Sequence, residues 1–162
     1  MMAFFSAYPL IYAVVYAVAG NSKRQMVKKL PSFLPYAYAL VGTLYLGFLL
    51  KNLYPDYSFE YIRLSVQQPF LKTWALLSLF FWIPFFAKKP VLSLLHSLVF
   101  LFFLVRDLFF QSTVPSADKN IVRNDMKLYT DSLLLNLGAL ILVILISLLI
   151  GRLKRQKRSP HT

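Results

Sequence analysis

The chain contains no cysteine, which excludes disulfide bonds and any metal or redox site built on thiolates. Histidine is almost as scarce, and His96 and His161 alone are too few for an ordinary transition-metal site. Only five glycines occur, and there is no glycine-rich phosphate loop, Ser-His-acid set, HExxH motif or paired catalytic carboxylate pattern. The sequence therefore predicts no metal and no cofactor, and it disfavours an enzyme.

Charge is also limited, and acidic residues are few. Charged residues make up 15% of the chain and only six residues are acidic, whereas 58% are hydrophobic and 17% aromatic. A soluble domain of 162 residues does not carry so much apolar material, so an integral membrane protein is predicted. The net charge of +12 does not point to nucleic acid, because the basic residues flank apolar segments and are not interleaved with exposed aromatics.

Five segments have close to the number of apolar residues, ~20, that a helix needs to cross a bilayer. The sequence thus predicts an all-α, five-transmembrane-helix bundle, with residues 1–151 as a single membrane domain and residues 152–162 as a polybasic cytoplasmic tail. The predicted spans are approximately Met2–Ala19, Phe33–Leu53, Phe70–Ala87, Pro90–Phe110 and Leu133–Ile150.

The basic residues predict the orientation, because Lys and Arg near span ends are retained on the cytoplasmic side. With five spans, eleven basic and no acidic residues fall on one side, against seven basic and six acidic residues on the other. The chain is therefore predicted to be N-out and C-in, in a cell inner (plasma) membrane. Ala17–Ala19 imitates a signal-peptide cleavage site, but the start of the chain lacks a basic region, so the first helix is expected to be retained.

The two outward loops keep apolar residues at helical spacing. In Asp56–Gln68, Phe59, Ile62 and Val66 share one helical face, and Ser116–Thr130 offers Ser116 as an N-cap before a second apolar stripe. Both loops are predicted to form short interfacial amphipathic helices on the outer surface. Irregular loops that happen to carry apolar residues are the alternative.

The second and fourth spans align without gaps at an offset of 55 residues, with Pro35 opposite Pro90. Their outer ends then read FLLKNLY and FLVRDLF, and each span follows a lysine pair. This pattern indicates a parallel duplication of a helical hairpin, with the fifth helix added. Chance similarity between segments rich in Leu and Phe is the competing explanation.

Polar side chains form a stripe along the fourth span. Ser93, His96, Asp107 and Gln111 lie on one helical face, with His96 and Asp107 roughly 16 Å apart along the axis. Ionisable groups at membrane depth are costly, so this polar seam is a candidate path for a proton or solute. The alternative is that His96 bonds a neighbouring helix while Asp107 lies at the outer interface.

Lys51, Asn52 and Arg106 mark the outer ends of the second and fourth spans. If these spans pack side by side, the two cations are candidates to bind a lipid phosphate or a partner's carboxylate. The alternative is snorkelling, in which long basic side chains at a helix end simply reach the headgroups.

The leading functional prediction is a non-catalytic integral membrane subunit that anchors or assembles a larger complex, with the lipid bilayer and other proteins as partners and no nucleic acid. It rests on the abundance of aromatic residues, which are favoured anchors in protein contacts, and on the scarcity of interior polar groups. A small transporter or channel using the fourth-span seam is the first alternative. A lipid-headgroup-binding or lipid-modifying protein is the second.

Overall fold

The computed structural model describes residues 2–54, 69–113 and 119–157. Every regular element in these ranges is a helix, which confirms the all-α prediction. Four stretches are long and apolar enough to cross a membrane, and they match the first, second, fourth and fifth predicted spans. These stretches are Met2–Asn21, Leu30–Asn52, Pro90–Phe110 and Met126–Lys154. The helix predicted for Asp56–Gln68 and the N-cap predicted at Ser116 lie outside the described residues.

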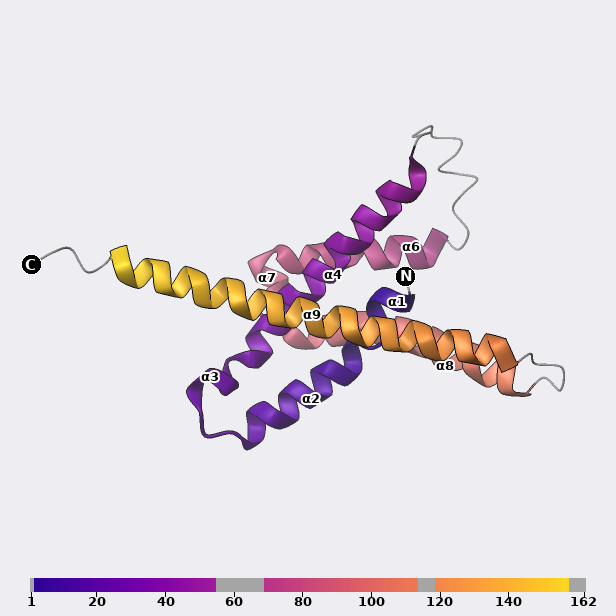
Figure 1. Ribbon diagram of the computed structural model, residues 1–162, viewed down its shortest axis with the longest axis horizontal. Helices are drawn as coiled ribbons and strands as arrows, with labels where there is room; N and C mark the ends of the chain where they lie inside the picture. The colour runs from indigo at the N-terminus through magenta and orange to yellow at the C-terminus, as the bar shows by residue number, and fades with distance from the viewer. Residues whose placement is uncertain (1, 55–68, 114–118, 158–162) are drawn as a thin grey trace, which may run out of the picture.

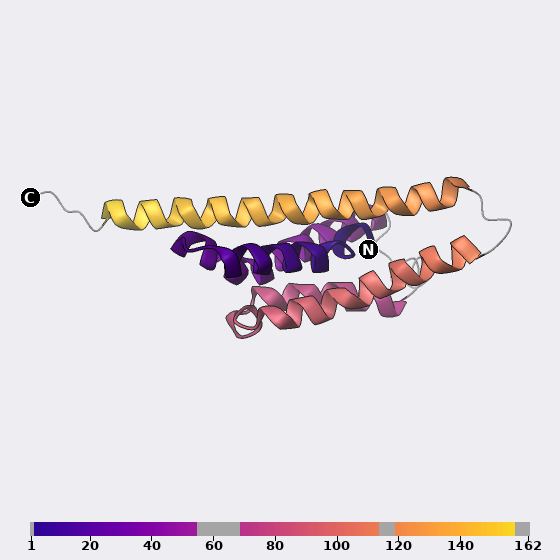
Figure 2. The same cartoon turned by 90° about the horizontal axis from the view of Figure 1, so that it is seen from below.

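The helices pack in three layers (Figures 1 and 2). The longest, α9, runs along one face, α2 and α4 form the middle layer, and α6 to α8 cover the opposite face. The elements are α1 (Met2–Phe5), α2 (Tyr8–Asn21), α3 (Gln25–Lys28), α4 (Leu30–Leu53), α6 (Pro69–Leu76), the 3₁₀ helix η1 (Leu77–Trp82), α7 (Pro84–Ala87), α8 (Pro90–Thr113) and α9 (Lys119–Lys157).

The first predicted span is a broken helix. It divides into α1 and α2, with Ser6 and Ala7 in a turn between them. The cause is Pro9 in the first turn of α2: proline has no N–H to donate to the carbonyl of Phe5, and its ring clashes with that carbonyl in a continuous helix. The break displaces the short α1 from the axis of α2 (Figure 1).

The third predicted span, Phe70–Ala87, is divided into α6, η1 and α7. Ile83 is extended, with φ −74° and ψ 127°, because the residue before a proline avoids the helical region, and Pro84 then begins α7. Eight α-helical and six 3₁₀ residues rise only about 24 Å, short of the ~30 Å hydrocarbon thickness. The crossing of the membrane by this third segment therefore stays a prediction.

Helix α9 corrects one predicted boundary. Residues 119–130 are not a separate surface helix, since one helix of 39 residues begins at Lys119 and continues through the fifth predicted span to Lys157. Residues 152–157 of the polybasic segment continue this helix, and the cytoplasmic location of that segment stays a prediction. Between Lys119 and Lys157 there is no proline, and the glycines Gly138 and Gly151 do not interrupt the helix. At 1.5 Å per residue, α9 is about 58 Å long, roughly twice the hydrocarbon thickness.

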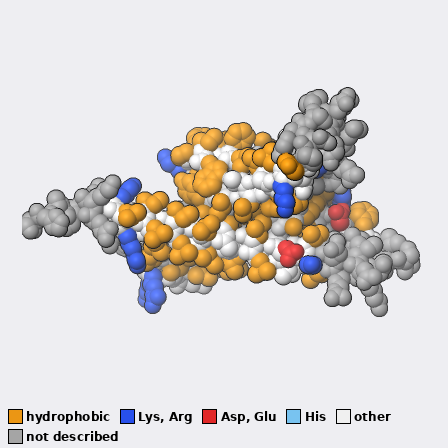
Figure 3. All heavy atoms as spheres, turned by 45° about the horizontal axis from the view of Figure 1, so that its top comes forward, with side chains coloured by type: hydrophobic (Ala, Val, Ile, Leu, Met, Phe, Trp, Pro, Cys, Tyr) orange, Lys and Arg blue, Asp and Glu red, His pale blue; other side chains and the backbone are white. Residues whose placement is uncertain are grey.

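Helix α4 occupies the centre of the bundle and contacts every other helix described. Its residues Leu34, Tyr38, Val41 and Tyr45 are buried among aromatic side chains from α1, α2, η1 and α8. The charged side chains lie toward the two ends of the bundle, and those of Asp and Glu that Figure 3 shows lie toward the end remote from the C-terminus. We call the end where α9 terminates the basic end, and the opposite end the acidic end.

The proposed duplication is not supported by matching helix boundaries. α4 and α8 both have 24 residues, but α4 begins five residues before Pro35, whereas α8 begins at Pro90 itself. An offset of 55 residues therefore does not superimpose the two helix ends. The duplication stays a prediction.

Candidate functional site

His96 of α8 is buried at the centre of a cage of aromatic rings. The rings of Tyr38, Trp74, Phe81 and Phe100 have centroids 4.9 to 6.0 Å from the imidazole. They come from α4, α6, η1 and α8, so one histidine joins four elements. An imidazole in such surroundings requires partners for both of its nitrogens.

Both nitrogens of His96 have partners. Nε2 lies 2.8 Å from the backbone oxygen of Trp74, and Nδ1 lies 2.6 Å from the hydroxyl of Tyr38. A carbonyl oxygen only accepts, so Nε2 carries the hydrogen, and Nδ1 of the neutral ring then accepts from Tyr38. The hydrogen-bonding capacity of His96 is therefore fully used within the bundle.

Ser93 lies one turn from His96 on the buried face of α8. Its hydroxyl donates to the backbone oxygen of Pro90 at 2.7 Å, so its oxygen accepts the hydroxyl hydrogen of Tyr8, also at 2.7 Å. Tyr8 and Tyr38 are adjacent, with ring centroids 4.4 Å apart. The hydrogen bond between Ser93 and Tyr8 thus joins α8 to α2, and the hydrogen bond between His96 and Tyr38 joins α8 to α4.

The structure does not extend the polar seam to Asp107. Phe100 is fully buried between the levels of His96 and Asp107, and its ring stacks on Phe5 at 4.8 Å. The carboxylate of Asp107 is half-exposed and forms an ion pair of 2.9 Å with its neighbour Arg106. The side chain of Gln111 lies outside the described part of the molecule. Ser93 and His96 of the predicted seam are therefore in the core, and the ring of Phe100 separates them from Asp107.

The outer cations occupy separate places. Lys51 and Asn52 are exposed near the end of α4, and α4 and α8 diverge toward the acidic end (Figure 1). The guanidinium of Arg106 contacts residues of its own helix, Asp107 and the ring of Phe103, whose centroid is 4.7 Å away. Lys51 and Arg106 therefore do not form one site in this conformation.

A second polar cluster joins α9 to the break between α1 and α2. Ser132 Oγ accepts the backbone N–H of Ala7 at 3.1 Å, and the Asn136 amide donates to the backbone oxygen of Phe4 at 2.6 Å. These side chains satisfy backbone groups that the break releases, as a broken helix within a membrane requires. Asn136 also donates to the Ser132 carbonyl, so its amide orientation is defined by two acceptors.

Sequence reasoning missed Tyr38, Trp74 and Tyr8 as the partners of the polar residues on α8. A signal existed in each case, since a tyrosine or tryptophan in mid-span needs a hydrogen-bond partner. Sequence reasoning also did not relate Pro9 to the backbone groups that Asn136 binds. Which residues meet across helices cannot be derived from one-dimensional periodicity.

The described residues contain no group of three or more His, Cys, Asp or Glu side chains arranged to hold a metal ion. The hydrogen bonds of His96, Ser93 and Asn136 instead hold the helices together. Comparison with protein-family models, with curated proteins and with solved structures found no match to this chain.

Proposed function

We propose that this protein is a non-catalytic integral membrane subunit that binds a transmembrane helix of another subunit in a larger complex. The central polar side chains support a structural role, because His96, Ser93 and Asn136 all form hydrogen bonds to neighbouring helices. The proposed setting is a cell inner membrane, with the chain N-out and C-in.

The observation that carries the proposal is a groove between α4 and α9 with Asp131 at one end. The groove has a volume of about 500 Å³, and its walls include Leu44, Leu134 and Leu142, which are all exposed. Gly138 lies in it with open space where a side chain would project, so a second helix can approach closely.

Asp131 supplies charge complementarity to a partner. Among the described residues its carboxylate has no ion-pair partner, and apolar side chains follow it for several turns of α9. A carboxylate at the edge of an apolar groove favours a cation on whatever occupies the groove. We therefore propose a partner helix with small or aliphatic residues along its length and a Lys or Arg at the level of Asp131.

Site-specific photo-crosslinking in cells tests this proposal. A crosslinking residue at Leu142 should capture one membrane protein, and the same residue at Phe102, which is exposed on α8, should not capture it. Asp131→Lys and Gly138→Phe should abolish the Leu142 adduct, whereas Asp107→Lys should leave it intact. A clean monomer in mild detergent without an adduct, or an adduct only with a second copy of this chain, would refute the proposal.

The two alternative functions receive less support from the geometry. Transport through the fourth-span seam requires a path past Phe100, which is fully buried. Joint binding of one headgroup by Lys51 and Arg106 requires these residues to lie close together, whereas the ends of α4 and α8 that carry them diverge. Loss of proton or solute flux in His96→Ala, with folding and partner binding retained, would favour transport over the subunit role.

A further inference from the structure

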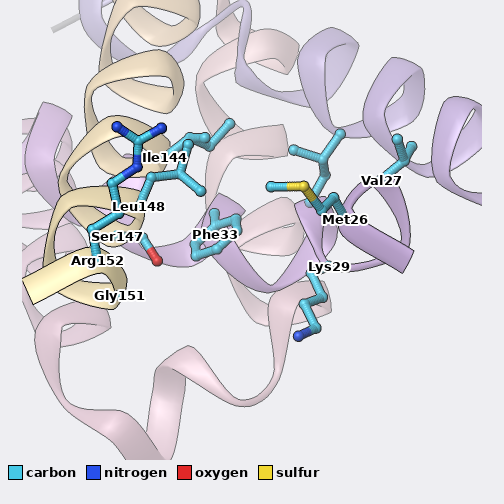
Figure 4. A pocket seen from close by; sticks show the side chains of 10 residues that line it. Met26, Val27, Lys29, Phe33, Ile144, Ser147, Leu148, Gly151 and Arg152 are labelled. Atoms are coloured by element: carbon cyan, nitrogen blue, oxygen red, sulfur yellow. The ribbon is translucent and has the colours of Figure 1, made fainter. Parts of the chain in front are cut away.

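A second cavity lies at the basic end of the bundle, between α9 and the start of α4 (Figure 4). It has a volume of about 640 Å³, within the range of sites that enclose small ligands. Ser147, Gly151 and Arg152 line it from α9, and the opposite wall includes Met26 of α3, Lys29 between α3 and α4, and Phe33 of α4. It shares no lining residue with the groove between α4 and α9.

The lining changes from basic to apolar with depth. Lys29 precedes α4 directly and Arg152 lies near the end of α9, so both exposed cations border the mouth, and their charged groups point to different sides of it in Figure 4. Phe33 is four residues deeper along α4, roughly 6 Å, and Ile144 is eight residues deeper along α9, roughly 12 Å. The cavity therefore presents positive charge at its mouth and hydrocarbon below it.

Acidic residues do not offset this charge. In the described ranges they are Asp107 near the end of α8 and Asp125 and Asp131 in the first third of α9, all toward the acidic end. Further basic residues, Lys28 and Lys154, lie close to the mouth in sequence. The local field therefore favours an anion.

We propose that this cavity binds one anionic phospholipid from the adjoining leaflet. Its phosphate is held at the mouth, where the long side chains of Lys29 and Arg152 turn toward it, and an acyl chain lies along Phe33, Ile144 and Leu148. A free phosphate would use only the mouth, whereas a phospholipid matches both the charge and the apolar depth. The Ser147 hydroxyl adds a donor on the same wall of the cavity.

Native mass spectrometry of the purified full chain, titrated with phosphatidylglycerol, phosphatidylcholine or inorganic phosphate, tests the assignment. We expect one phosphatidylglycerol to bind tightly and phosphatidylcholine to bind more weakly. Inorganic phosphate should not displace the bound phosphatidylglycerol. Lys29→Gln with Arg152→Gln should weaken phosphatidylglycerol binding about thirtyfold. Lys28→Gln with Lys154→Gln removes the same charge outside the cavity lining and should retain the tightly held lipid.

Two variants that leave the charge unchanged distinguish lipid binding in the cavity from general electrostatic attraction of the lipid to the protein. Gly151→Leu should fill the cavity and abolish the single lipid adduct, whereas Gly20→Leu, also at an open position, should retain it. A melting curve for each variant checks folding. Equal binding of the two lipids, displacement by inorganic phosphate, or an unchanged adduct in folded Gly151→Leu would overturn the proposal.

Discussion

The imidazole of His96 and the indole of Trp74 lie parallel, with ring centroids 4.9 Å apart and an angle of 6° between their planes. Each residue donates to the backbone oxygen of the other, at 2.8 Å from His96 Nε2 and at 3.1 Å from Trp74 Nε1. This reciprocal pair fastens α6, the irregular third segment, to α8. The pair gives His96 a structural role, because its ring nitrogens hydrogen-bond α6 and α4.

His96→Ala should lower the free energy of unfolding by about 2–4 kcal/mol, because it creates a cavity and leaves Tyr38 and the Trp74 carbonyl without partners. Reversible unfolding in mixed micelles measures the change. Leu95→Ala, at an exposed position on the same helix, is the control and should have a much smaller effect. Equal losses in the two variants would show that the pair contributes nothing specific.

Composition and charge were sufficient to predict a helical membrane protein and four of its spans, because apolar length alone decides whether a helix can cross. The breaks at Pro9 and Pro84 carried local signals, since proline affects the backbone wherever it occurs. The length of α9 was missed because the prediction ended the span at bilayer thickness, although no helix-breaking residue lies there. The partners Tyr38 and Trp74 depend on how helices rotate against one another, which one sequence does not encode locally.

Gly42 and Gly47 lie five residues apart on α4, and substitution by alanine should have different effects on stability at the two positions. A Cβ at Gly42 would collide with the Ser78 hydroxyl of η1, whereas Gly47 faces open space. Gly42→Ala should cost about 1–3 kcal/mol in unfolding free energy through overpacking. Gly47→Ala should be neutral or stabilising by up to ~1 kcal/mol, because alanine favours the helix.

The double variant Gly42→Ala with Ser78→Gly tests whether that contact is the cause. Removing the Ser78 side chain should recover most of the stability lost in Gly42→Ala, giving a coupling energy of about 1 kcal/mol or more in a double-mutant cycle. Simple additivity of the two single variants would assign the cost of Gly42→Ala to some other contact.

The hydrogen bond from Asn136 to the Phe4 carbonyl should matter only while the first span is broken. Asn136→Ala is expected to destabilise the bundle by about 1 kcal/mol, near the upper part of the range measured for interhelical hydrogen bonds in membranes. Pro9→Ala restores an N–H that can bond the Phe5 carbonyl, and should allow α1 and α2 to join. In the Pro9→Ala background, Asn136→Ala should therefore cost less, as unfolding in micelles would reveal. An undiminished cost would mean that Asn136 acts independently of the break.

The membrane crossing of the third segment can be decided by cysteine labelling, because the chain has no native cysteine. Gln25, Asn52 and Lys89 are all exposed, so single cysteines at these positions report on three connections between helices. Five spans with an outward N-terminus predict that an impermeant maleimide labels Asn52→Cys from outside, and the other two only after permeabilisation. The segment formed by α6 and η1 is about 6 Å shorter than the hydrocarbon core, a mismatch that local thinning of the bilayer accommodates at modest cost. External labelling of Lys89→Cys, with Gln25→Cys protected, would show instead that α6, η1 and α7 remain on the outer side and that the bundle has four spans.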